Sequence, residues 1–549
     1  MTAIFLDRLS RVKDPNLPRT AVLLRYSFAA LLVIIVGCLS RTGIALQMEP
    51  HSISLAEALE STLHNHPSVH IQDWEIESAR GSTQQAAGQF DTSLQSALQQ
   101  LSQDIPITGS ERTSLPISLQ GTKDQSLTST SYSLSINKLF RNGLSISSFA
   151  NVGRSKDNLG NQSGSSLSQV NLQLTVPLLR ARGHSIVDAT EMAARTELVA
   201  KKLDRIQVIE QLLTNTASSY WALVAAKGQL SVALASEDRG RTLVETVKVL
   251  IDADHVARND IYQVTANLAD RTATRIAAEQ ALEQARIQLG LDMGLSTIEL
   301  SHVGDPSDDF PPIAQVIPTS DDAALEAYLE EALVHRADFE AAEDREKEAR
   351  ILYRSAQNGI EPQINWQLST GYTQLRETGS LGSFFGSSFT ALHRPDVQTG
   401  IVYQFSPNNQ VAKGQLLQAQ AKLRVAELQK ADLRRQIAAN VRVALSNVRN
   451  SGLRLERARQ ALEAFQKTLD GERQKFSLGQ SSLTDLLTIE DRLTTSASRE
   501  VDAEQAYAVA LANLRLATGT LSPDSAGSNS VPPSLFRTVP AVPGSNGPH

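Results

Sequence analysis

The apolar positions of the chain switch between two spacings, one typical of helices and one typical of strands. Residues 54–87 carry apolar side chains every three to four positions, and from Phe90 onward the period becomes two. Residues 132–136 and 172–176 alternate apolar with polar side chains, and a Gly/Ser/Asn-rich segment, 157–166, lies between them. A period of two predicts strands with one apolar and one polar face.

After Pro177 the helical spacing returns, and the same order of elements then recurs in the second half of the chain. A Pro-rich stretch separates the two halves and holds Pro306, Pro311, Pro312 and Pro318. The later predicted elements are helices at 178–251, 260–293, 324–358, 408–478 and 483–516, with strands near 364–368 and 397–405. This order predicts a repeated unit.

The distances between landmark residues support a duplication. Asp260 precedes Gly294 by 34 residues, and Asp485 precedes Gly519 by 34 residues. The strand section of the first copy, 91–177, is about 40 residues longer than its counterpart in the second copy. A conserved order of elements at matched spacing is the signature of an internal repeat. The unit is therefore helix–strands–long helix–helix, with an insertion among the strands of the first copy.

The chain divides into five segments on this basis. They are a signal peptide at 1–45, a first structural repeat at 46–294, a Pro-rich linker at 295–323, a second structural repeat at 324–521 and a disordered C-terminal tail at 522–549. The tail is assigned from its Pro/Ser/Gly-rich composition, which offers little apolar surface to bury.

The N-terminus predicts export. Five basic residues precede an apolar run, 26–39, which is too short to span a bilayer comfortably, and Gly43 and Ala45 follow with cleavage-site spacing. Cys38, the one cysteine, ends the stretch Ile35–Cys38, which resembles a bacterial lipobox. A chance cysteine in a discarded signal is the alternative, and the Gly43–Ala45 site favours it. Either way no disulfide can form within the chain.

The alternating strands indicate the environment. Ten-residue segments of alternating polarity behind a signal peptide fit an outer-membrane β-barrel. Such barrels have at least about eight strands, and their strands must close so that no edge is unpaired in lipid. This chain offers four clear strands and two weaker ones, so several copies must share one barrel. The fold class is mainly α with membrane β-strands.

One long helix dominates each copy. Residues 408–478 would extend about 105 Å at ~1.5 Å per residue, roughly twice the length of the neighbouring helices. Between 437 and 469 the apolar and small residues are spaced alternately by four and three, which predicts a coiled-coil seam. A long helix can therefore lie beside two short ones stacked end to end.

The stretch Lys475–Leu493 predicts a helix that turns back on itself. Gly479 interrupts the helical pattern, and glycine takes the left-handed φ that such a turn needs without a steric penalty. Ser481 or Ser482 can cap the returning helix, and Asp485 lies one turn into it.

These stretches together resemble the TolC-like outer-membrane efflux proteins, also called outer membrane factors. The resemblance covers about 53–519. It rests on LAEALESTLHNHPSV (Leu55–Val69), VPLLRARG (Val176–Gly183), PQINWQLSTGY (Pro362–Tyr372) and KFSLGQSSLTDLL (Lys475–Leu487).

The resemblance implies a homotrimer that shares one outer-membrane β-barrel, continued across the periplasm of a Gram-negative cell by an α-helical barrel. It implies a passive exit duct for a tripartite efflux pump or a type I secretion system. The partners would be a periplasmic adaptor (membrane fusion) protein and an inner-membrane transporter. No catalytic step, cofactor or metal is implied. The inserted residues would form a further hairpin near Arg141–Gly143, either inside the barrel, giving about 18 strands, or outside it.

The resemblance also assigns a gate at the helix tips. Asp485 matches the first acidic ring residue, and the second falls on Thr488. The Tyr and Arg that lock the closed state fall here on Phe476 and Ser481. In the first copy, Asp260 matches a lock residue and Asp254 replaces the Gly479-like glycine, which Asp can do because it tolerates left-handed φ. Because of these departures, the sequence does not determine which contacts hold the closed state.

Composition and motifs weigh against other functions. The net charge of −7 gives no basic footprint for nucleic acid. His64 and His66 form the one close His pair, and a solvated or capping role is the simpler interpretation than a metal site. No phosphate loop or acid/base cluster stands out. The alternatives are a periplasmic coiled-coil adaptor, which requires a compact β-domain, and a coiled-coil scaffold, which requires neither signal nor duplication.

Overall fold

The computed structural model describes residues 52–314, 322–377, 395–521 and 532–540. The predicted signal peptide and Cys38 lie outside the described residues. Residues 52 onward form one compact unit. None of the described helices is long and apolar enough to cross a bilayer.

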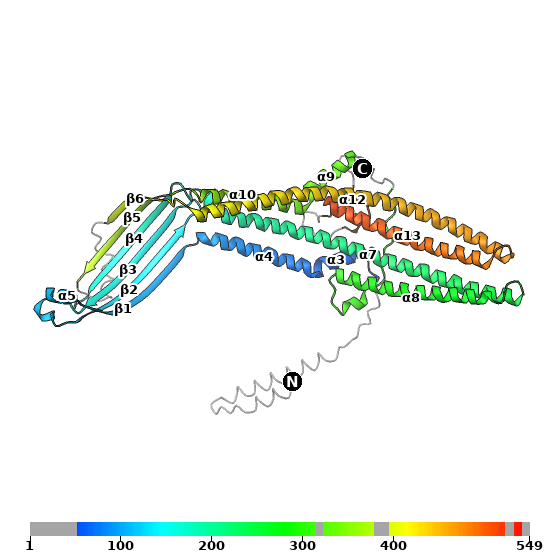
Figure 1. The fold of residues 1–549 in the computed structure, drawn as a ribbon, viewed down its shortest axis with the longest axis horizontal. Helices are drawn as coiled ribbons and strands as arrows, with labels where there is room; N and C mark the ends of the chain where they lie inside the picture. The colour runs from blue at the N-terminus through cyan, green and yellow to red at the C-terminus, as the bar shows by residue number, and fades with distance from the viewer. Residues whose placement is uncertain (1–51, 315–321, 378–394, 522–531, 541–549) are drawn as a thin grey trace, which may run out of the picture. The chain divides into compact units, whose positions relative to one another are not determined.

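The strands of both repeats form one antiparallel sheet of six strands in sequence order (Figure 1). The strands are β1 (Ser93–Pro106), β2 (Asp124–Leu139), β3 (Ser145–Asp157), β4 (Ser165–Pro177), β5 (Gln363–Arg376) and β6 (Asp396–Gln404). The first repeat contributes β1 to β4 and the second contributes β5 and β6. The insertion in the first repeat therefore adds a hairpin to the sheet itself.

The predicted turn at Arg141–Gly143 joins β2 to β3. Gly143 has φ +92°, a conformation that only glycine adopts at little cost. Its N–H donates to the carbonyl of Phe140 at 2.8 Å, and the N–H of Phe140 donates to the carbonyl of Leu144 at 2.8 Å. These bonds close a tight hairpin and hold the two strands in register.

The sheet leads into paired helices. They are α3 (Leu55–Asn65), α4 (Pro67–Ala87), α7 (Ala189–Asp252), α8 (Asp260–Asp292), α9 (Asp322–His335), α10 (Ala337–Asn358), α12 (Gln410–Ser477) and α13 (Leu483–Thr518). The short helices α5 (Gly109–Ser114) and α6 (His184–Val187) lie in connections. The long α7 packs against α4, α8, α10 and α13, and the long α12 packs against α9, α10 and α13. Each long helix thus lies beside shorter ones, as the helix lengths predicted.

Two helices that the sequence predicted as continuous are each broken in two. The helix over 54–87 stops at His66 and restarts at Pro67, and the helix over 324–358 stops at Arg336. His66 is extended, with φ −68° and ψ 124°, because a following proline disfavours the helical conformation of the residue before it. The His66 ring accepts from the N–H of Ser68 at 3.1 Å, so this histidine caps α4.

The Pro-rich linker is a packed part of the central core. Asp308 accepts from the N–H of Leu55 at 2.8 Å and from the hydroxyl of Tyr220 at 2.9 Å. The ring of Phe310 lies 5.8 Å from the ring of Trp221, which is fully buried. The linker therefore ties the first helix of the chain to the middle of α7.

The C-terminal tail is not disordered throughout, contrary to the prediction for 522–549. Residues 532–540 are ordered, and Phe536 is fully buried in the central core. The guanidinium of Arg515 donates to the carbonyl of Thr538 at 3.1 Å, and the hydroxyl of Tyr328 donates to the carbonyl of Pro540 at 2.9 Å. The amino-acid composition did not predict this ordered segment, because a single buried aromatic side chain is enough to anchor an otherwise polar stretch.

Glu210 of α7 is a carboxyl group in an unusual setting. It is 1% exposed, and neither carboxylate oxygen has a hydrogen-bond partner. Burial raises the pKa of Glu210 from its usual 4.5 to about 7, since the nearby positive charge of Arg336 compensates only in part and Asp338 adds to the rise. Glu210 is therefore largely protonated in the folded protein below neutral pH.

Replacing Phe536 with Ala should lower the free energy of unfolding by about 3–5 kcal/mol, because it empties a fully buried aromatic site. Thermal unfolding in mild detergent measures the loss. The matched control is Ile117→Ala, since Ile117 is 88% exposed and its truncation should leave the melting temperature unchanged. Equal melting temperatures for both variants would show that the segment does not anchor the core.

Glu210 also predicts a pH dependence. Between about pH 4.5 and about 7 the folded state binds more protons than the unfolded state, so the free energy of unfolding falls as pH rises, by up to ~1.4 kcal/mol per pH unit. Glu210→Gln should remove this slope. Denaturant midpoints at pH 5 and pH 8 for both proteins measure it. A variant with the wild-type slope would exclude Glu210 as its source.

Candidate gating site at the helix tips

The second hairpin turns at Gly479, as the sequence predicted. Gly479 has φ +73°, and the N–H of Gln480 donates to the carbonyl of Lys475 at 2.9 Å, which closes the end of α12. Ser482, and not Ser481, caps α13: its hydroxyl accepts from the N–H of Asp485 at 3.1 Å. Glycine at this point lets the chain reverse within a few residues.

The first hairpin makes the matching turn with an aspartate. Asp254 has φ +57°, so it occupies the left-handed conformation expected of a glycine substitute. The N–H of His255 donates to the carbonyl of Leu250 at 2.9 Å, and α8 starts at Asp260. The replacement of glycine by Asp254 therefore preserves the turn.

The acidic residues at the tips lie near solvent and bond locally. Asp485 and Asp254 are exposed, and Asp260 is half-buried at the start of α8. The carboxylate of Asp485 accepts from the hydroxyl of Ser482 at 2.6 Å. The hydroxyl of Thr488 donates to the carbonyl of Thr484 at 2.8 Å and is also exposed. These side chains are therefore accessible to solvent at the tips of a single copy.

Phe476 and Ser481 make contacts of a different kind from those expected of a tyrosine and an arginine at these positions. Phe476 is buried in an apolar cluster that joins both hairpins, with neighbours Val247, Val264, Leu469, Leu483 and Leu487. Ser481 donates to the carboxylate of Glu472 on its own hairpin. Phe476 therefore contributes an apolar contact between the hairpins where a tyrosine was expected. Ser481 contributes a hydrogen bond within its own hairpin where an arginine was expected.

A buried ion pair joins the two hairpins just above the tips. Arg271 of α8 is 5% exposed and Glu490 of α13 is 1% exposed, and Nη1 of Arg271 lies 2.7 Å from Oε2 of Glu490. The second oxygen of Glu490 accepts from Nη2 of Arg473 of α12 at 3.0 Å. Glu490 thus lies between a cation from each hairpin. We call Arg271, Glu490 and Arg473 the inter-hairpin triad.

Neighbouring groups hold Arg271 in place. Its Nη1 also donates to the carbonyl of Ser236 on α7 at 3.0 Å, and its Nη2 lies 3.3 Å from Asp491. Gly240 makes room for it, since a Cβ on Gly240 would lie 3.1 Å from Cδ of Arg271. Arg239 adds a second bridge by donating to Thr494 at 2.9 Å. The pair is therefore hydrogen-bonded on several sides, which a buried ion pair needs.

The sequence analysis missed this triad, although the pattern contains a signal for it. Glu490 interrupts the apolar stripe Leu483, Leu486, Leu493, and Arg271 continues the stripe of Val264. A charged residue at a core position of a coiled coil is costly unless it has a partner. Two such positions of opposite sign, one on the returning helix of each hairpin, could have been matched.

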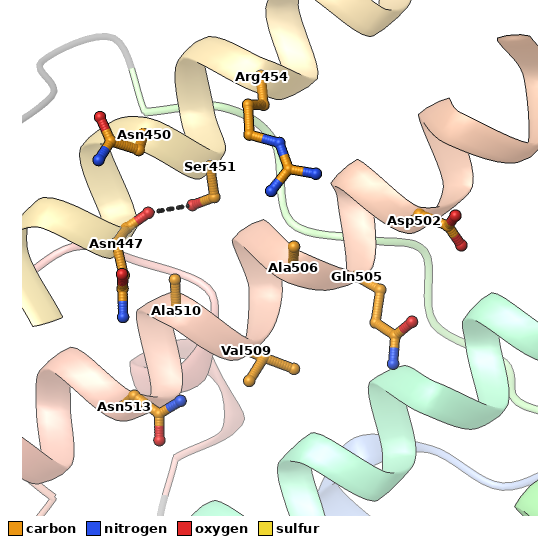
Figure 2. A pocket seen from close by; sticks show the side chains of 10 residues that line it. All are labelled: Asn447, Asn450, Ser451, Arg454, Asp502, Gln505, Ala506, Val509, Ala510 and Asn513. Atoms are coloured by element: carbon orange, nitrogen blue, oxygen red, sulfur yellow. Dashed lines mark hydrogen bonds between the residues drawn. The ribbon is translucent and has the colours of Figure 1, made fainter.

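A groove lies along the second hairpin (Figure 2). It has a volume of about 460 Å³ and runs between α12 and α13. Its lining is Asn447, Asn450, Arg454, Asp502, Gln505 and Asn513, among others. The hydroxyl of Ser451 bonds the carbonyl of Asn447 within the same helix at 2.6 Å.

Across the residues that the structure describes, no group of three or more His, Cys, Asp or Glu side chains could hold a metal ion. His64 bonds the carbonyl of Glu60 in its own helix. Together with the capping role of His66, this supports the structural interpretation of the His pair.

Comparison with known proteins matches this architecture. Residues 328–520 match the family model described as "Outer membrane efflux protein". TolC of Salmonella enteritidis is 25% identical over 361 residues, which covers 65% of this chain and 70% of the relative. The second half of the chain therefore resembles the outer membrane efflux proteins, and the chain is similar in sequence to TolC, an outer membrane protein.

Solved structures of outer-membrane proteins share the fold of this chain. VceC of Vibrio cholerae superposes with a TM-score of 0.61 at 17% identity, covering 85% of this chain and 96% of that chain. CmeC of Campylobacter jejuni gives a TM-score of 0.62 at 13% identity, covering 88% of this chain and 92% of that chain. VceC is described as an outer membrane protein and CmeC as an outer membrane channel, and at these identities the likeness shows a shared fold.

Replacing Glu490 with Gln should loosen the two hairpins, because it leaves the buried Arg271 with only the exposed Asp491, 3.3 Å from its Nη2, as a counter-charge. Breaking a buried pair in this way costs about 3–5 kcal/mol. Amide hydrogen exchange in α8 and α13 should therefore speed up near the triad. The control is Glu463→Gln. Its partner Lys467 is 75% exposed, so the loss of this ion pair should not change the exchange rates measurably. The double variant Arg271→Met with Glu490→Leu should restore protection from hydrogen exchange. Unchanged exchange in Glu490→Gln would exclude the triad as a link between the two hairpins.

Proposed function

We propose that this chain is the exit duct of a tripartite efflux pump or a type I secretion system, and that it conducts substrate passively to the exterior. The observation that carries the proposal is the direct run from an amphipathic sheet into two long helical hairpins, α7/α8 and α12/α13. The 68 residues of α12 extend about 100 Å at ~1.5 Å per residue. That length suits a conduit from the outer membrane across the periplasm.

The duct is a homotrimer in this proposal. Within one copy, β1 and β6 are the ends of the sheet, and each has one side without a neighbouring strand. A strand edge exposed to lipid would leave backbone groups without hydrogen bonds, at a cost of several kcal/mol each. Sharing one barrel among three copies satisfies these edges.

Gating takes place at the helix tips in this proposal. Three copies would bring three Asp485 carboxylates to the mouth, and the inter-hairpin triad would hold the hairpins of each copy together. The burial of Glu490 between Arg271 and Arg473 supports this, since separating the hairpins would expose or unpair these charges. Opening therefore requires either new partners for the charges or their hydration.

The partners proposed are a periplasmic adaptor protein and an inner-membrane transporter, which would dock at the exposed tips. The exposed polar side chains there, including Asp254 and Asp485, suit a reversible protein contact. The alternative of a periplasmic adaptor fits poorly, because the strands reach 16 residues in β2 and form one extended sheet rather than a compact β-domain.

The mouth can be tested by removing its charge. Asp485→Asn keeps the shape of the side chain and should weaken block by divalent cations several-fold, since three carboxylates no longer concentrate cations there. Single-channel recordings in planar bilayers measure block and conductance. Asp470→Asn is the control: it is the same exchange on the exposed surface of α12, and block should stay as in the wild type.

Identical block in Asp485→Asn and the wild type would exclude an acidic ring at this position. Complete absence of channel activity in the purified wild-type protein, across the voltages and ionic strengths tested, would contradict the duct itself.

A further inference from the structure

The six strands share one continuous alternation of faces. In one row of paired residues, Ser93, Asn137, Ser147, Gln173, Ser369 and Gln398 lie side by side from β1 to β6. In the next row, one residue along, the partners are Leu94, Ile136, Ser148, Leu172, Thr370 and Val397. Successive residues of a strand point to opposite faces, so one face is polar and the other is largely apolar.

All four strands of the longer first repeat, β1 to β4, follow the same alternation as β5 and β6 of the second repeat. Leu98 of β1 pairs with Tyr132 of β2, and Tyr132 pairs with Val152 of β3. A slip of one residue at either pairing would move the apolar side chains of β1 or β2 to the polar face. Leu94 and Leu98 of β1 are 67% and 74% exposed, so they have no cover within one copy. A hairpin outside the membrane would have no need of this apolar face.

Each strand is long enough to span the hydrocarbon core. The shortest, β6, has nine residues, and β1 to β5 have between 13 and 16. A membrane-spanning strand requires about 9–11 residues. The inserted strands therefore meet the same length requirement as the others.

The edges of the sheet are suited to each other. All neighbouring strands are antiparallel and their number is even, so β6 of one copy would also run antiparallel to β1 of the next. Every residue of β6 and nearly every residue of β1 is exposed in the single copy. A second copy of this chain is the occupant that extends the ladder without a change of direction.

We infer that three copies close an 18-stranded barrel by pairing β6 of each copy with β1 of the next, with the inserted hairpin as part of the wall. This rests on the trimer proposed above and adds its strand number and its lining. Two strands per repeat, as the second repeat has, would give only 12.

The strand number sets the width of the pore. At a strand spacing of ~4.8 Å and a tilt of ~40°, 18 strands give a backbone diameter of about 36 Å, against about 24 Å for 12 strands. Barrels of about 16–18 strands leave an aqueous channel. The membrane segment is therefore wide enough to leave size selection to the helix tips.

The lining identifies the class of cargo that the membrane segment admits. The polar face carries Ser, Thr, Asn and Gln along the six strands, with charged residues only at Asp157 and Asp396, at strand ends. Uncharged hydrogen-bonding groups do not sort solutes by the sign of their charge. The barrel therefore passes cationic, neutral and anionic hydrophilic cargo alike, and any charge preference arises at the tips.

Cysteine cross-linking distinguishes the two strand numbers. In a Cys38→Ser background, Gln398→Cys on β6 is combined in turn with Gln95→Cys, Ala97→Cys and Gln99→Cys on β1, which lie on the same polar face. The control combines Gln398→Cys with Ser147→Cys or Asn151→Cys on β3. Each pair is oxidised in outer membranes, the products are resolved on non-reducing gels, and the mass of each complex in mild detergent is measured separately.

The 18-stranded barrel predicts covalent trimers for at least one β1 pair and none for the β3 pairs, because β3 has strands on both sides. Cross-linking through β3, or trimeric mass without any β1 cross-link, would place β1 and β2 outside the wall while leaving the exit duct intact. A mass consistent only with monomer would contradict the trimer of the proposed function as well.

Discussion

Closure of a hydrogen-bonded sheet in lipid is the constraint on which this structure depends. Water cannot satisfy the backbone of a strand inside a bilayer, so each strand needs neighbours on both sides. One copy supplies six strands and two open edges. The even strand count and the alternation of apolar and polar residues are compatible with this constraint, and the trimer proposed above would satisfy both edges. The helices are built on a different principle, since they satisfy their own backbone and need only bury their apolar stripes.

The helical part solves a second problem, which is to keep two hairpins together without making them inseparable. Apolar side chains around Phe476 supply a contact that excludes water. Glu490, between Arg271 and Arg473, adds charges that are stable while paired and costly when separated. An all-apolar seam would give more stability but would not distinguish one register of the hairpins from another. The triad therefore favours the one register in which its charges are paired.

The sequence predicted the order of elements, the shared fold of the two repeats and both turns, because periodicity and glycine placement are local signals. It also predicted that Asp254 could replace a glycine. It did not predict the break at Arg336 or the break at His66, although Pro67 is a local signal for the latter. It also did not predict the partner of Glu490, which lies about 220 residues away in the chain. Side-chain pairing between distant helices depends on their relative rotation, and a single sequence does not contain that information.

The burial of Phe536 has a consequence for how the molecule is made. The central core draws on α3, on the middle of α7, on the linker and on this last aromatic side chain. Its packing can be completed only after the end of the chain has been synthesised and delivered to the same compartment. The first repeat must therefore wait, partly assembled, for the final residues to arrive, and chaperones of the envelope have that interval in which to act.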